Sequence, residues 1–99
     1  MSLSTVALAL LGNKTTRTMT LRHVGVLGAV CAAPQPSTVR GLAATIGCPK
    51  PSISRAIDEL EAVSLVARAR DPGDRRSVFV TGTKAGMKLV AEIEKRAAA

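Results

Sequence analysis

The chain has 99 residues and a formal net charge of +7 at pH 7, and Phe79 is the single aromatic residue in a sequence that is 46% hydrophobic. This length allows one domain with one core, which buries only about 60 to 65% of the unfolded surface, so a partner subunit would add stability. Proteins that bind single-stranded nucleic acid stack bases on aromatic rings, so the composition argues against that class, while the basic charge matches the phosphates of duplex DNA.

The first predicted element is a short, nearly all-apolar helix from Ser4 to Leu11, followed by a polar connector over residues 12–18. The apolar run has no Lys or Arg before it and is too short to cross a bilayer. We therefore expect neither a signal peptide nor a membrane span, and a cytoplasmic protein. A helix that is apolar on most sides must be covered, either by a second subunit or by the core of the same chain.

A second helix is predicted from its cap at Thr20 to about Ala32, and Pro34 and Pro36 end it. Its apolar side serves as scaffold and consists of Leu21, Val24, Leu27, Gly28 and Cys31.

A third helix begins after the capping residue Thr38, and its apolar residues recur with i, i+3, i+4, i+7 spacing. These residues are Val39, Leu42, Ala43 and Ile46. Gly47 supplies the left-handed stop, and Arg40 lies on the solvent face.

After a turn over residues 47–49, a fourth helix is predicted over residues 50–64, and its first turn accommodates Pro51. Its predicted buried stripe consists of Ile53, Ala56, Ile57, Leu60 and Val63. The residues that this phase turns outward near the amino-terminal end are Ser52, Ser54, Arg55 and Asp58. Glu59 and Glu61 lie toward the other end. A recognition helix presents its amino-terminal half to bases and phosphates, so this polarity favours binding to duplex DNA.

Two strands are predicted from Val66 to Arg70 and from Ser77 to Thr81, and Pro72-Gly73 supplies the turn between them. Thr83 then caps a last helix that runs to about Arg96. The apolar side of this helix consists of Met87, Leu89, Val90 and Ile93. We read residues 1–99 as one domain made of an N-terminal helix and linker (1–19), a helix-turn-helix (38–65), a wing (66–81) and a C-terminal helix (83–97).

This order of parts predicts a mainly α fold with a small β-hairpin, the winged helix-turn-helix. The hairpin concentrates four arginines, which are Arg68, Arg70, Arg75 and Arg76. Guanidinium groups at a hairpin tip can enter a narrow minor groove, where the negative potential is strongest. Asp74 is placed to hold Arg76 in an extended rotamer through a bidentate pair. The alternative is a solvated surface turn whose ion pair contributes about 0 to 1 kcal/mol.

The segments 38–43, 51–58, 65–66 and 71–78 together resemble the MarR family of bacterial transcriptional regulators, and the wing segment is the most specific of them. The resemblance covers about residues 20–93. It implies a homodimer on a pseudo-palindromic operator, with recognition helices in successive major grooves and wing arginines in the flanking minor grooves. It also implies recognition-helix contacts from Ser52, Ser54 and Arg55, and a wing pair of Asp74 and Arg76.

The chain departs from the family pattern at several positions. Pro49 stands where the family has a small polar cap, Ser64 where it has glycine, and Gly82-Thr83 where it has Leu-Thr. A left-handed serine costs up to about 1 kcal/mol relative to glycine, so a different closure of this helix end is expected. The short terminal segments argue against an effector pocket of the usual kind but leave room for a smaller dimer interface.

Few residues are candidates for a catalytic, redox or metal-binding role. Cys31 and Cys48 are read as free, buried and inert thiols rather than as a disulfide or a redox switch, and with only His23 available they form no metal set. His23 has no nucleophile or orienting carboxylate nearby in the sequence, so it is read as a surface or half-buried imidazole. We expect no enzyme, no metal and no cofactor.

The preferred interpretation is a homodimeric repressor that covers a promoter. Arg40 and Lys50 would hold phosphates, the three recognition-helix residues would meet bases or adjacent phosphates, and the wing tip would reach the minor groove. The full predicted DNA-binding set is Arg40, Lys50, Ser52, Ser54, Arg55, Arg68, Arg70, Asp74, Arg75 and Arg76. The alternatives are a winged-helix protein-interaction module and a weakly specific architectural DNA binder.

Overall fold

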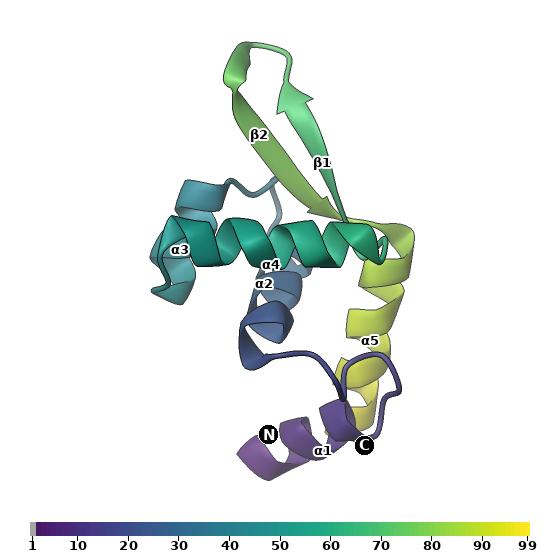
Figure 1. Ribbon diagram of the computed structural model, residues 1–99. Helices are drawn as coiled ribbons and strands as arrows, with labels where there is room; N and C mark the ends of the chain where they lie inside the picture. Colours follow the sequence, from purple (N-terminus) through teal and green to yellow (C-terminus); the bar gives the residue numbers. More distant parts are fainter. Residues whose placement is uncertain (1) are drawn as a thin grey trace.

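The computed structural model describes residues 2–99, and for residues 75–77 it describes the backbone but not the side chains. Within these residues the elements follow in the order α1 (Leu3–Leu11), α2 (Leu21–Ala32), α3 (Val39–Ile46), α4 (Lys50–Ala62), β1 (Val66–Asp71), β2 (Asp74–Gly82) and α5 (Lys84–Ala98). Figure 1 shows α4 lying across α2, with the hairpin projecting away from the helices. The predicted mainly α class with one small hairpin is confirmed.

Threonine side chains cap three of the helices where the sequence predicted them. The hydroxyls of Thr20, Thr38 and Thr83 each accept a hydrogen bond from the backbone N–H three residues later, at 3.2, 3.0 and 3.0 Å. Gly47 ends α3 in the left-handed conformation, with φ of 79°. At the start of α4, Pro49 offers no such cap, so Pro51 in the first turn is the local signal that begins this helix.

The carboxyl end of α4 closes through Ser64 in the left-handed conformation, with φ of 62°. The N–H of Ser64 donates to Glu61 O at 2.9 Å and the N–H of Leu65 donates to Leu60 O at 3.0 Å, which is the Schellman pattern. The expectation of a different closure was therefore wrong. Thr83 compensates in part, because its hydroxyl donates to the Ser64 carbonyl at 2.6 Å.

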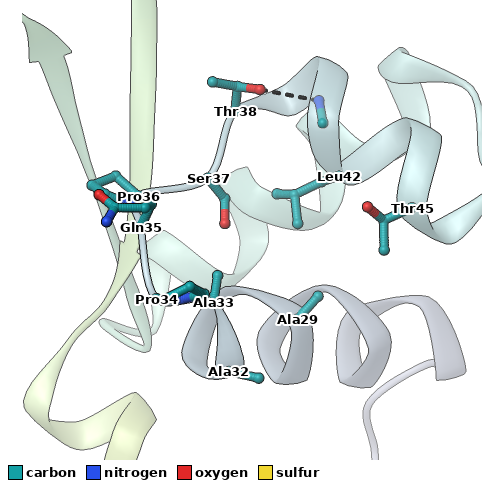
Figure 2. A pocket seen from close by; sticks show the side chains of 11 residues that line it. Ala29, Ala32, Ala33, Pro34, Gln35, Pro36, Ser37, Thr38, Leu42 and Thr45 are labelled. Atoms are coloured by element: carbon teal, nitrogen blue, oxygen red, sulfur yellow. Dashed lines mark hydrogen bonds between the residues drawn. The ribbon is translucent and has the colours of Figure 1, made fainter.

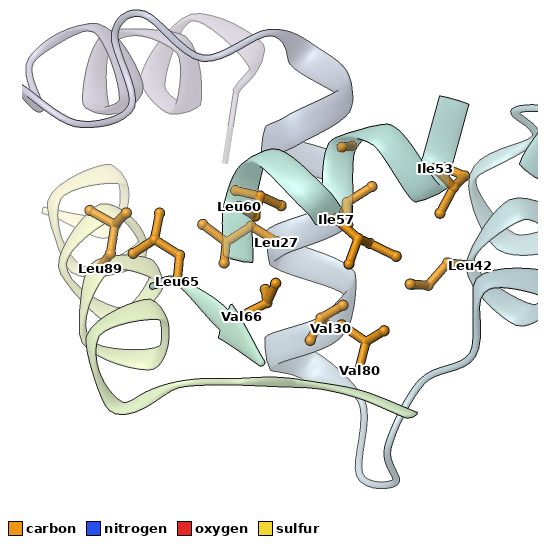
Figure 3. Close-up of a cluster of buried hydrophobic side chains, with 12 residues drawn as sticks. Leu27, Val30, Leu42, Ile53, Ile57, Leu60, Leu65, Val66, Val80 and Leu89 are labelled. Atoms are coloured by element: carbon orange, nitrogen blue, oxygen red, sulfur yellow. The ribbon is translucent and has the colours of Figure 1, made fainter. Parts of the chain in front are cut away.

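The core joins α2, α3, α4, the hairpin and the first half of α5 (Figure 3). Its buried members are Val26, Leu27, Val30, Leu42, Ile53, Ala56, Ile57, Leu60, Leu65, Val66, Val80 and Leu89. The predicted stripes of α3 and α4 are confirmed apart from Val63, which is 61% exposed. In α2, Leu21 is 84% exposed, and the buried residues Val26 and Val30 lie outside the predicted apolar side. Leu21 is the first residue of α2, and Val63 is the C-cap of α4, where helical phase ends. Met87, predicted on the apolar side of the last helix, is also exposed.

The wing is a two-stranded antiparallel hairpin in which Val66 pairs with Gly82 and Arg70 pairs with Val78. Its turn needs only Pro72 and Gly73, because the Asp71 carboxylate accepts a hydrogen bond from the Gly73 N–H at 2.8 Å. Strand β2 therefore begins at Asp74 rather than at the predicted Ser77. At the other end, Ser37 pairs with Val80 through two backbone hydrogen bonds of 3.0 and 2.8 Å.

Helix α1 packs beside the carboxyl-terminal part of α5 (Figure 1), and Arg96 donates to the Gly12 carbonyl at 3.2 Å. The same chain thus covers one side of α1, where Ala9 is buried, while Leu3, Leu8 and Leu11 remain exposed. Among the described residues, no helix is long and apolar enough to span a membrane.

Candidate nucleic-acid interface

The amino-terminal half of α4 carries the predicted recognition residues. The Arg55 side chain is 84% exposed, Ser52 and Ser54 are half-buried, and Lys50 at the helix start is exposed. Arg40 is exposed on α3. These two helices flank the turn at Gly47, so they place cations and hydroxyls around the start of α4, which is the arrangement that a helix-turn-helix uses against phosphates and base edges.

Arg68 of β1 lies against α4 instead of pointing into solvent. Its Nη2 lies 2.7 Å from Asp58 Oδ1, and its Nη1 donates to Glu61 Oε1 at 2.9 Å. The backbone N–H of Arg68 donates to the second oxygen of Glu61 at 3.3 Å, and Nη2 also lies 3.4 Å from Ser54 O. One arginine thus joins the wing to the recognition helix at three points.

The environment of Arg68 strengthens this contact. Burial alone would lower the pKa of the guanidinium, but its hydrogen bonds to Asp58 and Glu61 and their negative charges outweigh burial and raise the pKa. The side chain is only 25% exposed. Arg68 therefore stays charged, and it neutralises carboxylates that α4 would otherwise carry close to the predicted DNA surface.

A second link between elements runs through His23. Its Nε2 lies 2.9 Å from Glu59 Oε2 on α4, and its Nδ1 hydrogen-bonds the hydroxyl of Thr20. The other oxygen of Glu59 lies 3.7 Å from Arg55 Nε. The imidazole is half-buried, as predicted. No carboxylate lies near it in the sequence, but the fold supplies one from 36 positions away.

The wing tip carries the rest of the predicted set. Arg70 and Asp74 are exposed. The side chains of Arg75 and Arg76, and with them the predicted Asp74–Arg76 pair, lie outside the described residues.

The two cysteines are free and half-buried. Burial, with a smaller contribution from the charge of Glu94, raises the pKa of the Cys31 thiol, which disfavours its nucleophilic thiolate form. Across residues 2–99, apart from the side chains of 75–77, no three His, Cys, Asp or Glu residues are grouped so that they could hold a metal ion.

The hollows among the described residues include two that lie away from the start of α4. A shallow groove of about 470 Å³ runs between the end of α2, the segment 34–38 and α3, and small side chains such as Ala29 and Ala33 line it (Figure 2). A smaller apolar pocket of about 130 Å³ lies between α1, α2 and α5, with Leu10, Leu27 and Ile93 among its walls.

Comparison with known proteins identifies the family. The family model described as MarR family matches residues 17–77, which include the helix-turn-helix and most of the wing. The chain belongs to the MarR family. MarR-family regulators are DNA-binding transcription factors rather than enzymes. By sequence alone, no curated protein matches the chain significantly.

Solved MarR-type structures share the fold. CouR from Rhodococcus jostii RHA1, solved with p-coumaroyl-CoA bound, is 32% identical, with a TM-score of 0.77 over 97% of this chain and 64% of its own. The MepR–DNA complex of S. aureus is 24% identical, with a TM-score of 0.80 over 95% of this chain and 74% of its own. RV1404 from Mycobacterium tuberculosis is 20% identical, with a TM-score of 0.85 over 97% of this chain and 63% of its own. The chain therefore spans just under two thirds of RV1404 and CouR.

The sequence predicted which cations are exposed, but it did not predict the ion pairs between different elements. Local patterns place Arg55 and Arg40 on helix surfaces, because helical periodicity fixes which way they face. The Glu59–His23 and Arg68–Asp58 contacts join residues from different elements, so local residue spacing does not predict them. The sequence did contain one indication of these ion pairs. Three carboxylates lie on one short helix of a basic protein, and each would need a cationic partner if the helix approached DNA.

Proposed function

We propose that this MarR-family chain is a sequence-specific transcriptional regulator that binds duplex DNA with α4 in the major groove and the wing at the minor groove. One observation carries the proposal above all: the outer face at the start of α4 presents Lys50 and a highly exposed Arg55, while carboxylates further along the helix contact Arg68 or His23. A surface with this distribution of charge attracts phosphates and leaves donors free for base edges.

The predicted contact set is kept with one change of role. Arg40 and Lys50 would hold phosphates, Ser52, Ser54 and Arg55 would read bases or adjacent phosphates, and the wing-tip residues Arg70, Asp74, Arg75 and Arg76 would lie along the minor groove. Arg68 would act through α4, because its guanidinium already contacts two carboxylates. We therefore treat it as a positioning residue rather than as a phosphate contact.

A homodimer is part of the proposal. The exposed leucines of α1 form an apolar surface beside α5, and a second copy of the chain would cover it. Such a dimer would bind an inverted repeat with half-sites about 10 base pairs apart and would repress by covering a promoter. Residues 1–99 would then act as a single DNA-binding unit.

The proposal includes no effector of the size that CouR binds. The apolar pocket between α1, α2 and α5 has a volume of about 130 Å³, whereas pockets for drug-sized ligands span about 300 to 1,000 Å³. The groove beside α3 has a volume of about 470 Å³, but it is shallow, so it would not enclose such a ligand.

The deciding experiment is selection of bound duplexes from a random pool by the purified protein, at near-physiological salt with excess competitor DNA. Recovery of an inverted repeat supports a dimeric sequence-specific regulator. Salt-sensitive binding without a motif would replace the proposal with an architectural DNA binder, and absence of binding would replace it with a protein-interaction module.

A further inference from the structure

The recognition helix carries a glutamate whose two oxygens serve different neighbours. Glu59 Oε2 lies 2.9 Å from His23 Nε2, and Glu59 Oε1 lies 3.7 Å from Arg55 Nε. The carboxylate therefore stands between a residue of the scaffold helix α2 and an exposed cation of the recognition helix.

The His23 end of this arrangement is fixed. The hydroxyl of Thr20 accepts a hydrogen bond from the backbone N–H of His23 and also bonds Nδ1 of its ring. A carboxylate can only accept, so Nε2 donates to Glu59. The imidazole is only 17% exposed. Glu59 therefore loses less conformational freedom when it pairs with Arg55 than an unanchored glutamate on a helix surface would.

The contact with Glu59 leaves the terminal nitrogens of the Arg55 guanidinium free to bind a base. Glu59 approaches Nε, which lies on the inner side of the group, so the two terminal nitrogens remain available at a side chain that is 84% exposed. Those two nitrogens are the donors that an arginine uses in a bidentate contact with guanine O6 and N7.

We propose that Glu59, anchored by His23, is a positioning residue that sets the direction of Arg55 and so determines specificity for a guanine in the operator half-site. This inference rests on the proposed function. It adds a residue that touches no DNA yet controls which base is preferred, because an arginine held in one direction discriminates among bases better than a mobile one does.

The test compares base preferences of full-length variants on the selected operator, with each base pair of one half-site substituted in turn. Wild type should prefer G·C at one position, and Arg55→Ala should abolish that preference, by about 5- to 150-fold if the contact is bidentate. Glu59→Gln should lower the same preference by about 1.4- to 5-fold, the range of an exposed ion pair, and His23→Ala should lower it in the same direction. In the Arg55→Ala background, Glu59→Gln should change the preference no further.

The matched control is Glu92→Gln on α5, which makes the same change in net charge and should raise affinity for all sequences equally while preserving the base ranking. Circular dichroism and thermal unfolding identify folded variants, and Glu59→Ala provides a second substitution at the site. An unchanged base ranking in both folded Glu59 variants would overturn the inference while the proposed function stood. Failure of wild type to select any motif would overturn both.

Discussion

Arg68 Nη2 lies 2.7 Å from Asp58 Oδ1, so a single guanidinium fastens the first strand of the wing to the recognition helix. The carboxylate of Glu61 completes the contact from the next turn of α4. The two DNA-facing parts of the domain are thus held in a fixed relation by charge as well as by the shared apolar core.

We expect Arg68→Ala to lower the free energy of unfolding by about 1 kcal/mol, because partly exposed charge-assisted hydrogen bonds are lost. DNA affinity should fall more than this stability change explains, because two uncompensated carboxylates then face the duplex. Adding Asp58→Asn and Glu61→Gln should restore part of the affinity, measured by titration of labelled operator at fixed salt.

The matched control for this rescue neutralises Glu92 and Glu94 in the Arg68→Ala background, which makes the same change in net charge on α5. If the Asp58/Glu61 substitutions and the Glu92/Glu94 substitutions restore affinity equally, Arg68 contacts phosphate directly and the positioning role is wrong.

Arg76→Ala should weaken operator binding without unfolding the protein, since a wing-tip guanidinium would contribute to DNA binding and little to the core. The slope of log affinity against log salt should become shallower by about one unit if one phosphate contact is lost. An affinity equal to that of wild type at the same salt would contradict the assignment of the wing.

Ser64→Gly should raise the free energy of unfolding by up to about 1 kcal/mol, because residue 64 adopts a φ of 62° that glycine accepts without steric cost. Chemical denaturation at equilibrium measures the gain. Ser64→Ala retains the Cβ and should give no gain, so equal stabilisation by both substitutions would show that backbone strain is not the cause.

Cys31 should react slowly with alkylating reagents in the folded protein. Its pKa is raised by burial, so at any pH below that value a smaller fraction is thiolate than for an exposed cysteine. In a Cys48→Ser background, alkylation by iodoacetamide at pH 8 should be at least about threefold slower in the native state than in urea. A native rate that matches or exceeds the rate in urea would argue for a reactive, sensing thiol.

Local chemistry predicted most of the elements, because caps such as Thr20 and Thr38 and the stop at Gly47 act within one helical turn. Burial at helix ends was predicted less well. Leu21 and Val63 continue an apolar pattern in the sequence, but Leu21 is the first residue of α2, Val63 is the C-cap of α4, and both are exposed. Ser64 shows the opposite case, since a tertiary hydrogen bond from Thr83 supports a conformation that local preference disfavours.

The candidate site divides in the same way. Arg55 and Lys50 could be placed on the outer face of α4 from spacing alone, because one periodicity governs the whole helix. His23 and Glu59 become neighbours only when α2 crosses α4, and Arg68 turns inward because Asp58 and Glu61 attract it. Long-range contacts of this kind depend on how the elements pack against one another, and local sequence patterns do not predict that packing.

The backbone pairing of Ser37 with Val80 also limits which changes in chain length the domain can absorb. It joins the entrance of α3 to the base of the wing, so an inserted residue between Pro34 and Ser37 would shift the pairing and withdraw two backbone groups from their partners. The turn at Pro72-Gly73 has no such second attachment among the described residues. Natural variation in wing length should therefore accumulate at the tip, where reach toward the DNA can change while the frame beneath it stays the same.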